Sequence, residues 1–280
     1  MVRRDAIVVI AVALSSACSL VTSLDGRSGA ADAGAGTGAL VDAGRDGEVD
    51  AADGSEADAP GTYRDVVLAD RPIGYWRLGD TDALGPVIDE TGNVAGAFAG
   101  AIELGRPGIQ PDNPAMGFDG KVSEITIPGA RYDFGGNAPF TIEAWIRPTV
   151  VDPIYRRIVT NEVGGVRQGW LFWVVDQESG GIGIERYRDN DGDTVTTALA
   201  PALGVWSHVV ATYDGAILSI WLDGSLRSSA PSERSIAGQS RLRIGGLASG
   251  RFSGDLDEVA IYDRALTAPR IAAHHDAGKR

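Results

Sequence analysis

A carboxylate in an otherwise apolar strand is the first feature of this sequence that could do chemistry. Side chains of a strand alternate between two faces, so Asp257 shares its face with Val259 and Ile261 and is aimed towards the interior. An unpaired charge in that position is strongly unfavourable. Asp257 therefore needs a partner, which can be a cation, an arginine or backbone N–H groups.

Tryptophan rings opposite apolar strand faces are the second feature. The apolar side chains of 140–146 alternate onto one face, which puts Glu143 and Trp145 on the other. Trp221 likewise lies opposite the apolar set of 217–222. Sugar rings stack on exposed aromatic faces, and carboxylates bind sugar hydroxyls. Trp145, Trp221 and Glu143 are therefore predicted to form a ligand platform; the alternative is that the tryptophans fill the core.

An acidic string at 189–193 invites comparison with a calcium-binding loop. An EF-hand loop needs Gly at its sixth position and Glu at its twelfth, where this sequence has Thr194 and Ala200. The spacing is therefore wrong for that loop. The string is better explained as the tip of a hairpin between strands at 182–187 and 194–199.

The elements that must position these residues are short strands separated by turns rich in Gly, Asp, Asn and Pro. Asp214-Gly215 and Asp223-Gly224 each follow a strand, and Asp-Gly is a strong hairpin signal. Only 265–277 has a helical pattern. Short strands at this spacing indicate an all-β sandwich or jelly roll, which we expect to span 63–280. The predicted strands include 140–146, 206–213, 217–222, 241–244 and 256–262.

Several strings of this domain together carry a resemblance to a known family. They are Tyr63–Asp80, Asp89–Asn93, Phe118–Gly120, Phe140–Pro148, Trp206–Gly215 and Leu256–Leu266. In this order they resemble bacterial laminin-G-like domains of the concanavalin A-like lectin/glucanase superfamily. The resemblance implies two antiparallel sheets packed face to face, one gently concave, with 63–80 supplying the opening strand.

The resemblance also implies a structural calcium ion. Members of the superfamily often hold Ca²⁺ with an acidic residue of the last strand and groups near the first strand and its loop. The matching residues here are Asp80, Asp89, Asn93 and Asp257. Ca²⁺ takes about six to eight oxygen ligands, so backbone carbonyls and water must supply the rest. The alternative is that Asp257 caps backbone amides and the other three residues sit in turns.

Glycan hydrolysis is the less favoured activity for such a scaffold. Glucanases of the superfamily use two glutamates on one strand, in a pattern like Glu-x-Asp-x-x-Glu. The nearest string, 255–258, has the wrong residues and spacing, and the pattern Gly-x-Ser-x-Gly is absent from the sequence. We therefore expect a non-catalytic module that binds carbohydrate. A protein-interaction or structural surface module is the alternative.

The first 62 residues are predicted to be a signal peptide followed by a linker. Basic residues, a short apolar run and small residues describe a signal peptide over 1–18. Its end, 14–18, resembles a bacterial lipoprotein signal, although Ser15 stands where an aliphatic residue is usual. Cys18 is therefore the predicted lipidation site, and simple secretion with cleavage near Ala17 is the alternative. The Gly/Ala/Asp-rich segment 19–62 is predicted to be a disordered linker.

The net charge and the cysteine count limit the kinds of ligand and metal site that the chain can have. The chain has a formal charge of −13 and no cluster of Lys or Arg, so it is a poor binder of nucleic acid. Its single cysteine excludes a disulfide within the chain and a thiolate metal cluster. The expected protein is secreted and anchored by lipid to the outer membrane or cell surface, with a carbohydrate or a cell-surface protein as its partner.

Overall fold

The computed structural model describes residues 61–162, 166–237, 241–247 and 250–280. The predicted signal peptide, Cys18 and the linker up to residue 60 lie outside these residues. Within them, no helix is long and apolar enough to cross a membrane.

Antiparallel strands form most of the described domain. The strands are β1 Gly74–Trp76, β2 Ala97–Ala99, β3 Ile102–Gln110, β4 Asn113–Asp119, β5 Glu124–Pro128, β6 Phe140–Pro148, β7 Arg156–Thr160, β8 Gly169–Val174, β9 Ile182–Arg188, β10 Asp191–Thr196, β11 Ser207–Tyr213, β12 Ile217–Leu222, β13 Ser225–Pro231, β14 Arg241–Ile244 and β15 Ser253–Tyr262. The helices are α1 Tyr63–Ala69 and α2 Ala268–Gly278.

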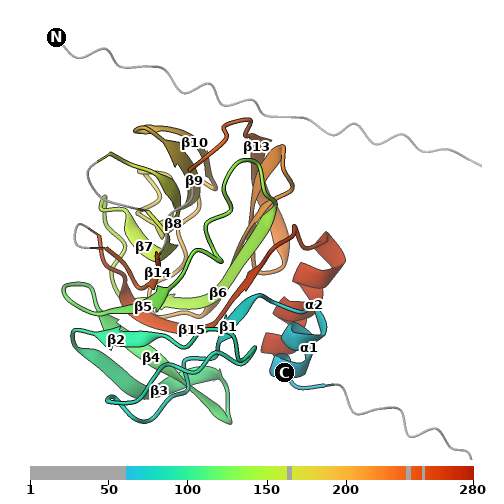
Figure 1. The fold of residues 1–280 in the computed structure, drawn as a ribbon. Coiled ribbons are helices and arrows are strands. Elements are labelled where there is room, and N and C mark those ends of the chain that lie inside the picture. Colours follow the sequence, from blue (N-terminus) through green and yellow to red (C-terminus); the bar gives the residue numbers. More distant parts are fainter. Residues whose placement is uncertain (1–60, 163–165, 238–240, 248–249) are drawn as a thin grey trace, which may run out of the picture. The chain divides into compact units, whose positions relative to one another are not determined.

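The strands form two sheets packed face to face (Figure 1). Sheet I has the order β13-β12-β11-β6-β15-β4-β3, and β1 pairs with β15 beside this path. Sheet II has the order β10-β9-β8-β7-β14-β5-β2. The prediction of an antiparallel β-sandwich is confirmed.

The core between the sheets follows the predicted alternation. Phe140, Ile142, Ala144 and Ile146 of β6 are all buried in it. Removing such side chains from water contributes about 1.5–3 kcal/mol each. The residues that meet them from sheet II include Trp170, Phe172, Ile184 and Ile244.

Tight turns set the register of the hairpins. Asp223 and Gly224 both have positive φ and form the two-residue turn between β12 and β13, as a primed turn requires. Asp189 and Asn190 do the same between β9 and β10. The acidic string is therefore a hairpin tip, as predicted, although β10 already begins at Asp191.

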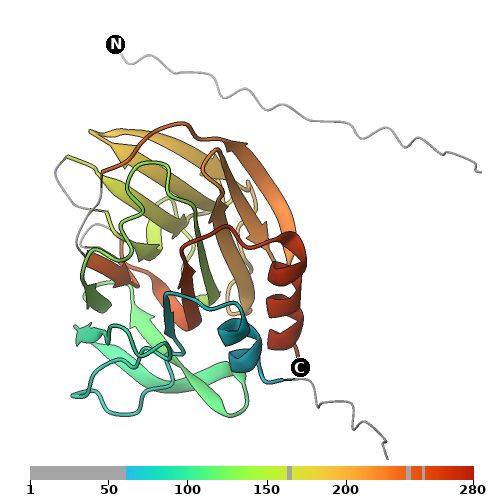
Figure 2. The ribbon, with the colours of Figure 1, turned by 45° about the vertical axis from the view of Figure 1, so that its right-hand side comes forward.

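Two helices cover the outer face of sheet I, and one of them was not predicted. The string expected to supply an opening strand begins with α1, and only Gly74–Trp76 within it is extended. Helix α1 starts with a capping box, in which Thr62 and Asp65 satisfy each other's backbone N–H groups. Figure 2 shows α1 and α2 side by side against this sheet. Their apolar residues and the outer face of sheet I form a second core.

Candidate functional site

The predicted aromatic platform is not exposed. Trp145 is 1% exposed and Glu143 is 0% exposed, so the expectation that they face solvent is wrong. Both do lie opposite the main core, but α1 and α2 cover that face of the sheet. Trp221 is half-buried against the same second core, and its Nε1 donates to Thr212 Oγ1 at 3.2 Å.

Glu143 joins the helices to the sheet. It accepts from His274 Nδ1 at 2.8 Å and from the Tyr63 hydroxyl at 3.3 Å. His274 Nε2 lies 2.8 Å from an Asp70 oxygen, which Arg270 also contacts at 2.7 Å. Burial alone would raise the pKa of Glu143, but the imidazole of His274 lowers it. Burial would lower the pKa of His274, but Glu143 and Asp70 raise it, so a charged pair holds α2 in place.

The four predicted calcium ligands do not form one site. Both oxygens of Asp89 accept from backbone N–H groups, Oδ1 from Tyr75 at 3.0 Å and Oδ2 from Val94 at 2.9 Å. Asn93 uses its Nδ2 on the Ile73 carbonyl at 3.2 Å. Within the described residues, no three His, Cys, Asp or Glu side chains gather in a way that suits a metal ion. These residues therefore do not fit a calcium ion bound by this set.

Asp257 is held by the protein itself. Its Oδ2 accepts from the Ile109 backbone N–H at 2.9 Å, and its Oδ1 accepts from Asn113 Nδ2 at 3.0 Å. This is the backbone-capping alternative that the sequence left open. The expectation that Asp257 shares a face with Val259 and Ile261 is wrong. Asp257 is paired with Trp145 on the outer face of sheet I, whereas Val259 belongs to the main core.

A β-bulge explains this reversal. The pairing of β15 with β6 shifts between Asp257 and Ala260, and Glu258 has a φ of 53°. An extra residue in a strand breaks the alternation of faces, and a positive φ is strained for glutamate. Glu258 is fully buried beside Asp257. It accepts from Arg77 Nε at 3.1 Å and Nη2 at 3.0 Å, and from the hydroxyl of Tyr75.

Burial makes this pair of carboxylates hard to ionise. It is the main reason that the pKa of Asp257 is raised well above its usual value, and the charge of Glu258 adds to the effect. Burial also raises the pKa of Glu258 to about 7, against the opposing effect of Arg77. Hydrogen bonds join Asp257 and Glu258 to Arg77, Tyr75 and Asn113 in one buried polar network beneath the first loop.

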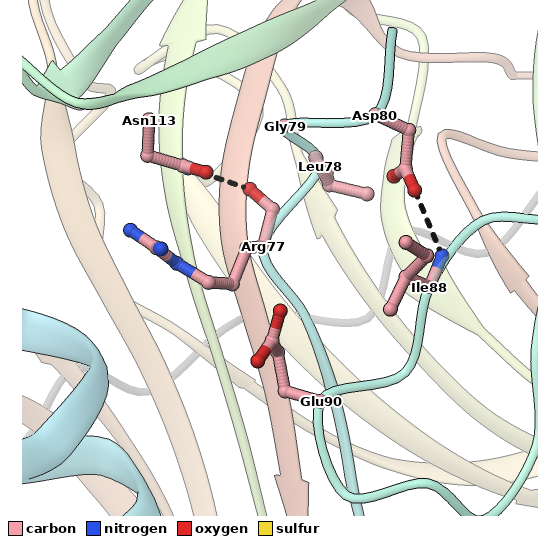
Figure 3. Close-up of a pocket in the computed structure, with 7 residues that line it drawn as sticks. All are labelled: Arg77, Leu78, Gly79, Asp80, Ile88, Glu90 and Asn113. Atoms are coloured by element: carbon pink, nitrogen blue, oxygen red, sulfur yellow. Dashed lines mark hydrogen bonds between the residues drawn. The ribbon is translucent and has the colours of Figure 1, made fainter. Parts of the chain in front are cut away.

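Above this network lies a small cavity of about 150 Å³, lined by polar residues and by Leu78, Gly79 and Ile88, which Figure 3 shows. Asp80 and Glu90 come from the loop after β1, Arg77 from the end of that strand and Asn113 from the start of β4. Asp80 Oδ1 accepts from the Ile88 backbone N–H at 3.0 Å. Burial, reinforced by the charge of Glu90, raises the pKa of Asp80.

The polar groups of the cavity are only partly used. Asn113 is 5% exposed, and its Nδ2 donates to its neighbours, including the Arg77 carbonyl at 3.0 Å. Its Oδ1 has no donor in the part of the chain that the structure describes, and neither have Asp80 Oδ2 and Glu90 Oε1. Arg77 directs Nε and Nη2 at Glu258, which leaves Nη1. A Cβ on Gly79 would lie 2.3 Å from Asn113 Oδ1, so the glycine keeps this acceptor uncovered. Three of the residues that line the cavity thus each have an acceptor oxygen without a donor among the described residues, and Arg77 lines it as well.

Sequence reasoning named Asp80 but missed Arg77, Glu90 and Asn113. These residues come together through long-range pairing of the first loop, β4 and β15, which no local pattern reports. One signal was present. Two consecutive acidic residues, Asp257 and Glu258, stand in an apolar strand, and they cannot both be accommodated by simple alternation.

Comparisons with known proteins agree with the fold. A family model described as the concanavalin A-like lectin/glucanases superfamily matches residues 119–272. No curated protein sequence matches the chain significantly.

Among solved structures, domain 4 of AbnA, a GH43 extracellular arabinanase from Geobacillus stearothermophilus in complex with arabinotriose, is similar at 16% identity and a TM-score of 0.58. The match covers 72% of this chain and 97% of that one. The binding domain of Paraclostridial Mosquitocidal Protein 1 is 18% identical, with a TM-score of 0.57 over 72% of this chain and 51% of that one. The binding domain of Botulinum Neurotoxin DC in complex with SialylT is 13% identical, with a TM-score of 0.56 over 76% and 52%. At such identities the likeness concerns the fold.

Proposed function

The chain belongs to the concanavalin A-like lectin/glucanase superfamily, and on that premise we propose that it is a non-catalytic module that binds carbohydrate at the cavity of Arg77, Asp80, Glu90 and Asn113. The observation that carries the proposal is that Asp80, Glu90 and Asn113, whose free acceptor oxygens have no donor among the described residues, line one small cavity together with Arg77. Sugar hydroxyls both donate and accept, so one sugar residue can satisfy such a mixed set. Because a fold does not fix function, the proposal rests on the residues that line this cavity.

Preorganisation supports the proposal. Arg77 and Asn113 are held by the buried carboxylates beneath them, so their free groups need little reordering when a ligand binds. The solved complexes of similar folds with arabinotriose and SialylT are consistent with a glycan ligand.

The same geometry favours binding over hydrolysis. A glycosidase needs a protonated carboxyl that reaches the glycosidic oxygen and a second carboxylate near the same bond. Glu258 has a raised pKa, but it is fully buried and occupied by Arg77 and Tyr75. Asp80 and Glu90 do line the cavity, but its volume of about 150 Å³ is small for the two sugar rings that flank a scissile bond.

We propose secretion and lipid anchoring at Cys18 on the sequence alone. The motif 14–18 and the short apolar run before it support this proposal. Mass spectrometry of the protein from the membrane fraction of a lipoprotein-processing host should find Cys18 at the N-terminus carrying acyl chains. An unmodified N-terminus in the soluble fraction would contradict it.

The test of binding uses the full chain with Asp80→Asn and Glu90→Gln together. Isothermal titration with neutral oligosaccharides, including arabinotriose, should show binding by the wild type and a loss of at least about tenfold in the double variant. Asp112→Asn is the matched control, because it removes an exposed charge next to Asn113 without lining the cavity. Unchanged binding in the double variant would place the sugar elsewhere. Release of shorter sugars by the wild type, lost in Asp80→Asn, would show a hydrolase.

A further inference from the structure

Two arginines without a counterion stand on the outer face of sheet II. Strand β14 lies between β7 and β5 in that sheet. Leu242 and Ile244 of β14 are buried in the main core, so the alternation of the strand turns Arg241 and Arg243 to the other face. Helices α1 and α2 pack on sheet I and not on this face (Figure 1). Neither arginine lines the cavity described above.

Arg241 and Arg243 have no carboxylate partner in the part of the chain that the structure describes. Arg243 is half-buried, and the only side-chain hydrogen bond that it makes there runs from Nη1 to the Glu162 carbonyl at 3.4 Å. Burial lowers the pKa of Arg243, and the positive charges of Arg241 and Arg251 add to this effect. An arginine nevertheless stays charged in a protein. Arg243 is therefore a half-buried cation whose charge is not compensated by a direct ion pair.

The carboxylates around these two residues are already paired with other arginines. Glu162 binds Arg157 at 3.1 Å and Arg167 at 2.9 Å. The remaining pairs are Arg167 with Glu185 at 3.8 Å and Arg251 with Glu124 at 3.3 Å. With Arg241 and Arg243, this connected group has five arginines against three glutamates. It carries a local excess of two positive charges, although the chain as a whole has a formal charge of −13.

The surface beside Arg243 is low and carries a free hydroxyl group. Arg243 is paired across the sheet with Thr126 of β5, and Thr126 is paired with Ala97 of the terminal strand β2. Residues paired in this way share one face of a sheet. Thr126 is half-buried and Ala97 is exposed, and the Thr126 hydroxyl makes no hydrogen bond to another described residue. A ring that lies over Ala97 can therefore bring a hydroxyl group to Thr126 and a carboxylate to Arg243.

These groups suit a sugar acid better than other anionic partners. A guanidinium group binds a carboxylate through two parallel N–H donors, and a uronic acid carries its carboxylate and its hydroxyl groups on one ring. A protein partner needs an apolar centre, and single-stranded nucleic acid needs rings on which its bases stack. The residues that β14, β5 and β2 turn outward include neither a large apolar side chain nor an aromatic ring.

We propose that Arg241, Arg243 and Thr126 bind a uronic acid residue of an acidic polysaccharide. The inference rests on the proposed function, because it adds a second contact, with a charged residue, for the same class of ligand. The net negative charge of the chain repels a polyanion at long range. Binding should therefore depend on direct pairing with the two guanidinium groups and should weaken as salt is added.

The test compares polygalacturonate with its methyl ester, two polymers that share a backbone and differ in charge. In biolayer interferometry the immobilised full chain should bind polygalacturonate at least about tenfold more tightly than the ester. Arg241→Gln with Arg243→Gln should remove this difference. The thermal midpoint of this double variant should not fall, because neither arginine has a carboxylate partner among the described residues.

The matched control is Arg227→Gln with Lys279→Gln. It removes the same two charges from exposed positions in β13 and directly after α2, so it should bind polygalacturonate as the wild type does. An equal loss in the control would show an effect of net charge alone and would overturn the inference. Equal affinity of the wild type for the two polymers, or unchanged polygalacturonate binding in Arg241→Gln with Arg243→Gln, would also overturn it.

Two further ligands separate a sugar from other anions. Single-stranded DNA and vesicles of phosphatidylglycerol should bind more weakly than polygalacturonate. Equal binding to either one, lost in the same double variant, would show a surface for anions in general and would overturn the assignment to a sugar. The arabinotriose titration decides the proposed function separately. No binding of any sugar polymer or oligosaccharide by the wild type would contradict the proposed function and the inference with it.

Discussion

The outer faces of the two sheets differ in what covers them. On sheet I, Glu143 and Trp145 are buried by α1 and α2, and the charge of Glu143 is met by His274 from a helix. On sheet II, charged residues such as Arg157 and Glu162 are paired with one another, and Tyr155 remains open to solvent. Exposure of a strand face is therefore a property of the tertiary arrangement, which the alternation of residues along the strand does not report.

Two histidines on the covered face show how much its environment varies over a short distance. His208 is fully buried with no partner for either ring nitrogen in the described structure, and burial lowers its pKa to about 4. His274 is also buried, but Glu143 and Asp70 hold both of its nitrogens and raise its pKa. Burial alone neutralises an imidazole, whereas burial between two carboxylates keeps it charged.

The largest expected effect comes from removing the charge of His274, which holds helix α2 on the outer face of sheet I through Glu143. His274→Ala leaves Glu143 buried without its cation, so the free energy of unfolding should fall by about 3–5 kcal/mol. Urea denaturation measures this. His275→Ala is the control from the adjacent helix position, since His275 makes no contact with Glu143, and it should have a smaller effect. A loss below that of the control would mean that the helix is held by apolar contacts alone.

The pH dependence of stability tests the contact of His274 with Glu143 and Asp70, with a smaller expected effect. The folded-state pKa of His274 is raised, so its contribution is complete below its unfolded pKa of about 6.5 and is lost as the pH rises through the folded value. The stability difference between the wild type and His274→Gln should therefore be largest near pH 6 and shrink towards alkaline pH. Urea midpoints from pH 6 to 10 measure it. A difference that is constant over this range would show that His274 is neutral.

Matched glycine substitutions probe the tryptophan on each face. A Cβ on Gly278 would lie 2.3 Å from the Trp145 ring, and a Cβ on Gly183 would lie 2.1 Å from the Trp173 ring. Overpacking of this kind costs about 1–3 kcal/mol, so Gly278→Ala and Gly183→Ala should both lower the urea midpoint. An unchanged urea midpoint in either variant would show that the neighbouring tryptophan ring moves to make room for the methyl group.

The smallest expected effect is that of calcium. Asp89 and Asp257 are occupied by N–H donors, so we expect the thermal midpoint to be the same in EDTA and in excess Ca²⁺. Differential scanning calorimetry measures it. A calcium-dependent rise in the midpoint would show that the folded state binds the ion, and would restore a calcium site with other ligands.

Local patterns predicted the fold well. The apolar alternation of β6 and the Asp-Gly turns after β11 and β12 depend on neighbouring residues, so the sequence displays them directly. Helix α1 was also within reach, because Thr62 and Asp65 have the spacing of a capping box. A strand was predicted where α1 lies. Without α1 the outer face of sheet I is half uncovered, and this is why Trp145 was predicted to be exposed.

The site was much less predictable than the fold. The direction of Asp257 depends on one strained residue, Glu258, whose positive φ has no local signature. The cavity needs Asn113 from β4 next to Asp80 and Arg77 from the first loop. These contacts join residues that are far apart in sequence, and only the completed pairing of the strands brings them together.

The meeting of α1 and α2 has a consequence for how this domain can be connected to others. Gly61 and Arg280 line the same groove between these helices, so the chain enters and leaves the described domain at one place. Domains with neighbouring ends tolerate insertion into a loop of a host protein and closure into a circular permutant. A short Gly/Ser peptide from Arg280 to Gly61, with new ends opened at the Asp189-Asn190 turn, should preserve both sheets and leave the cavity intact.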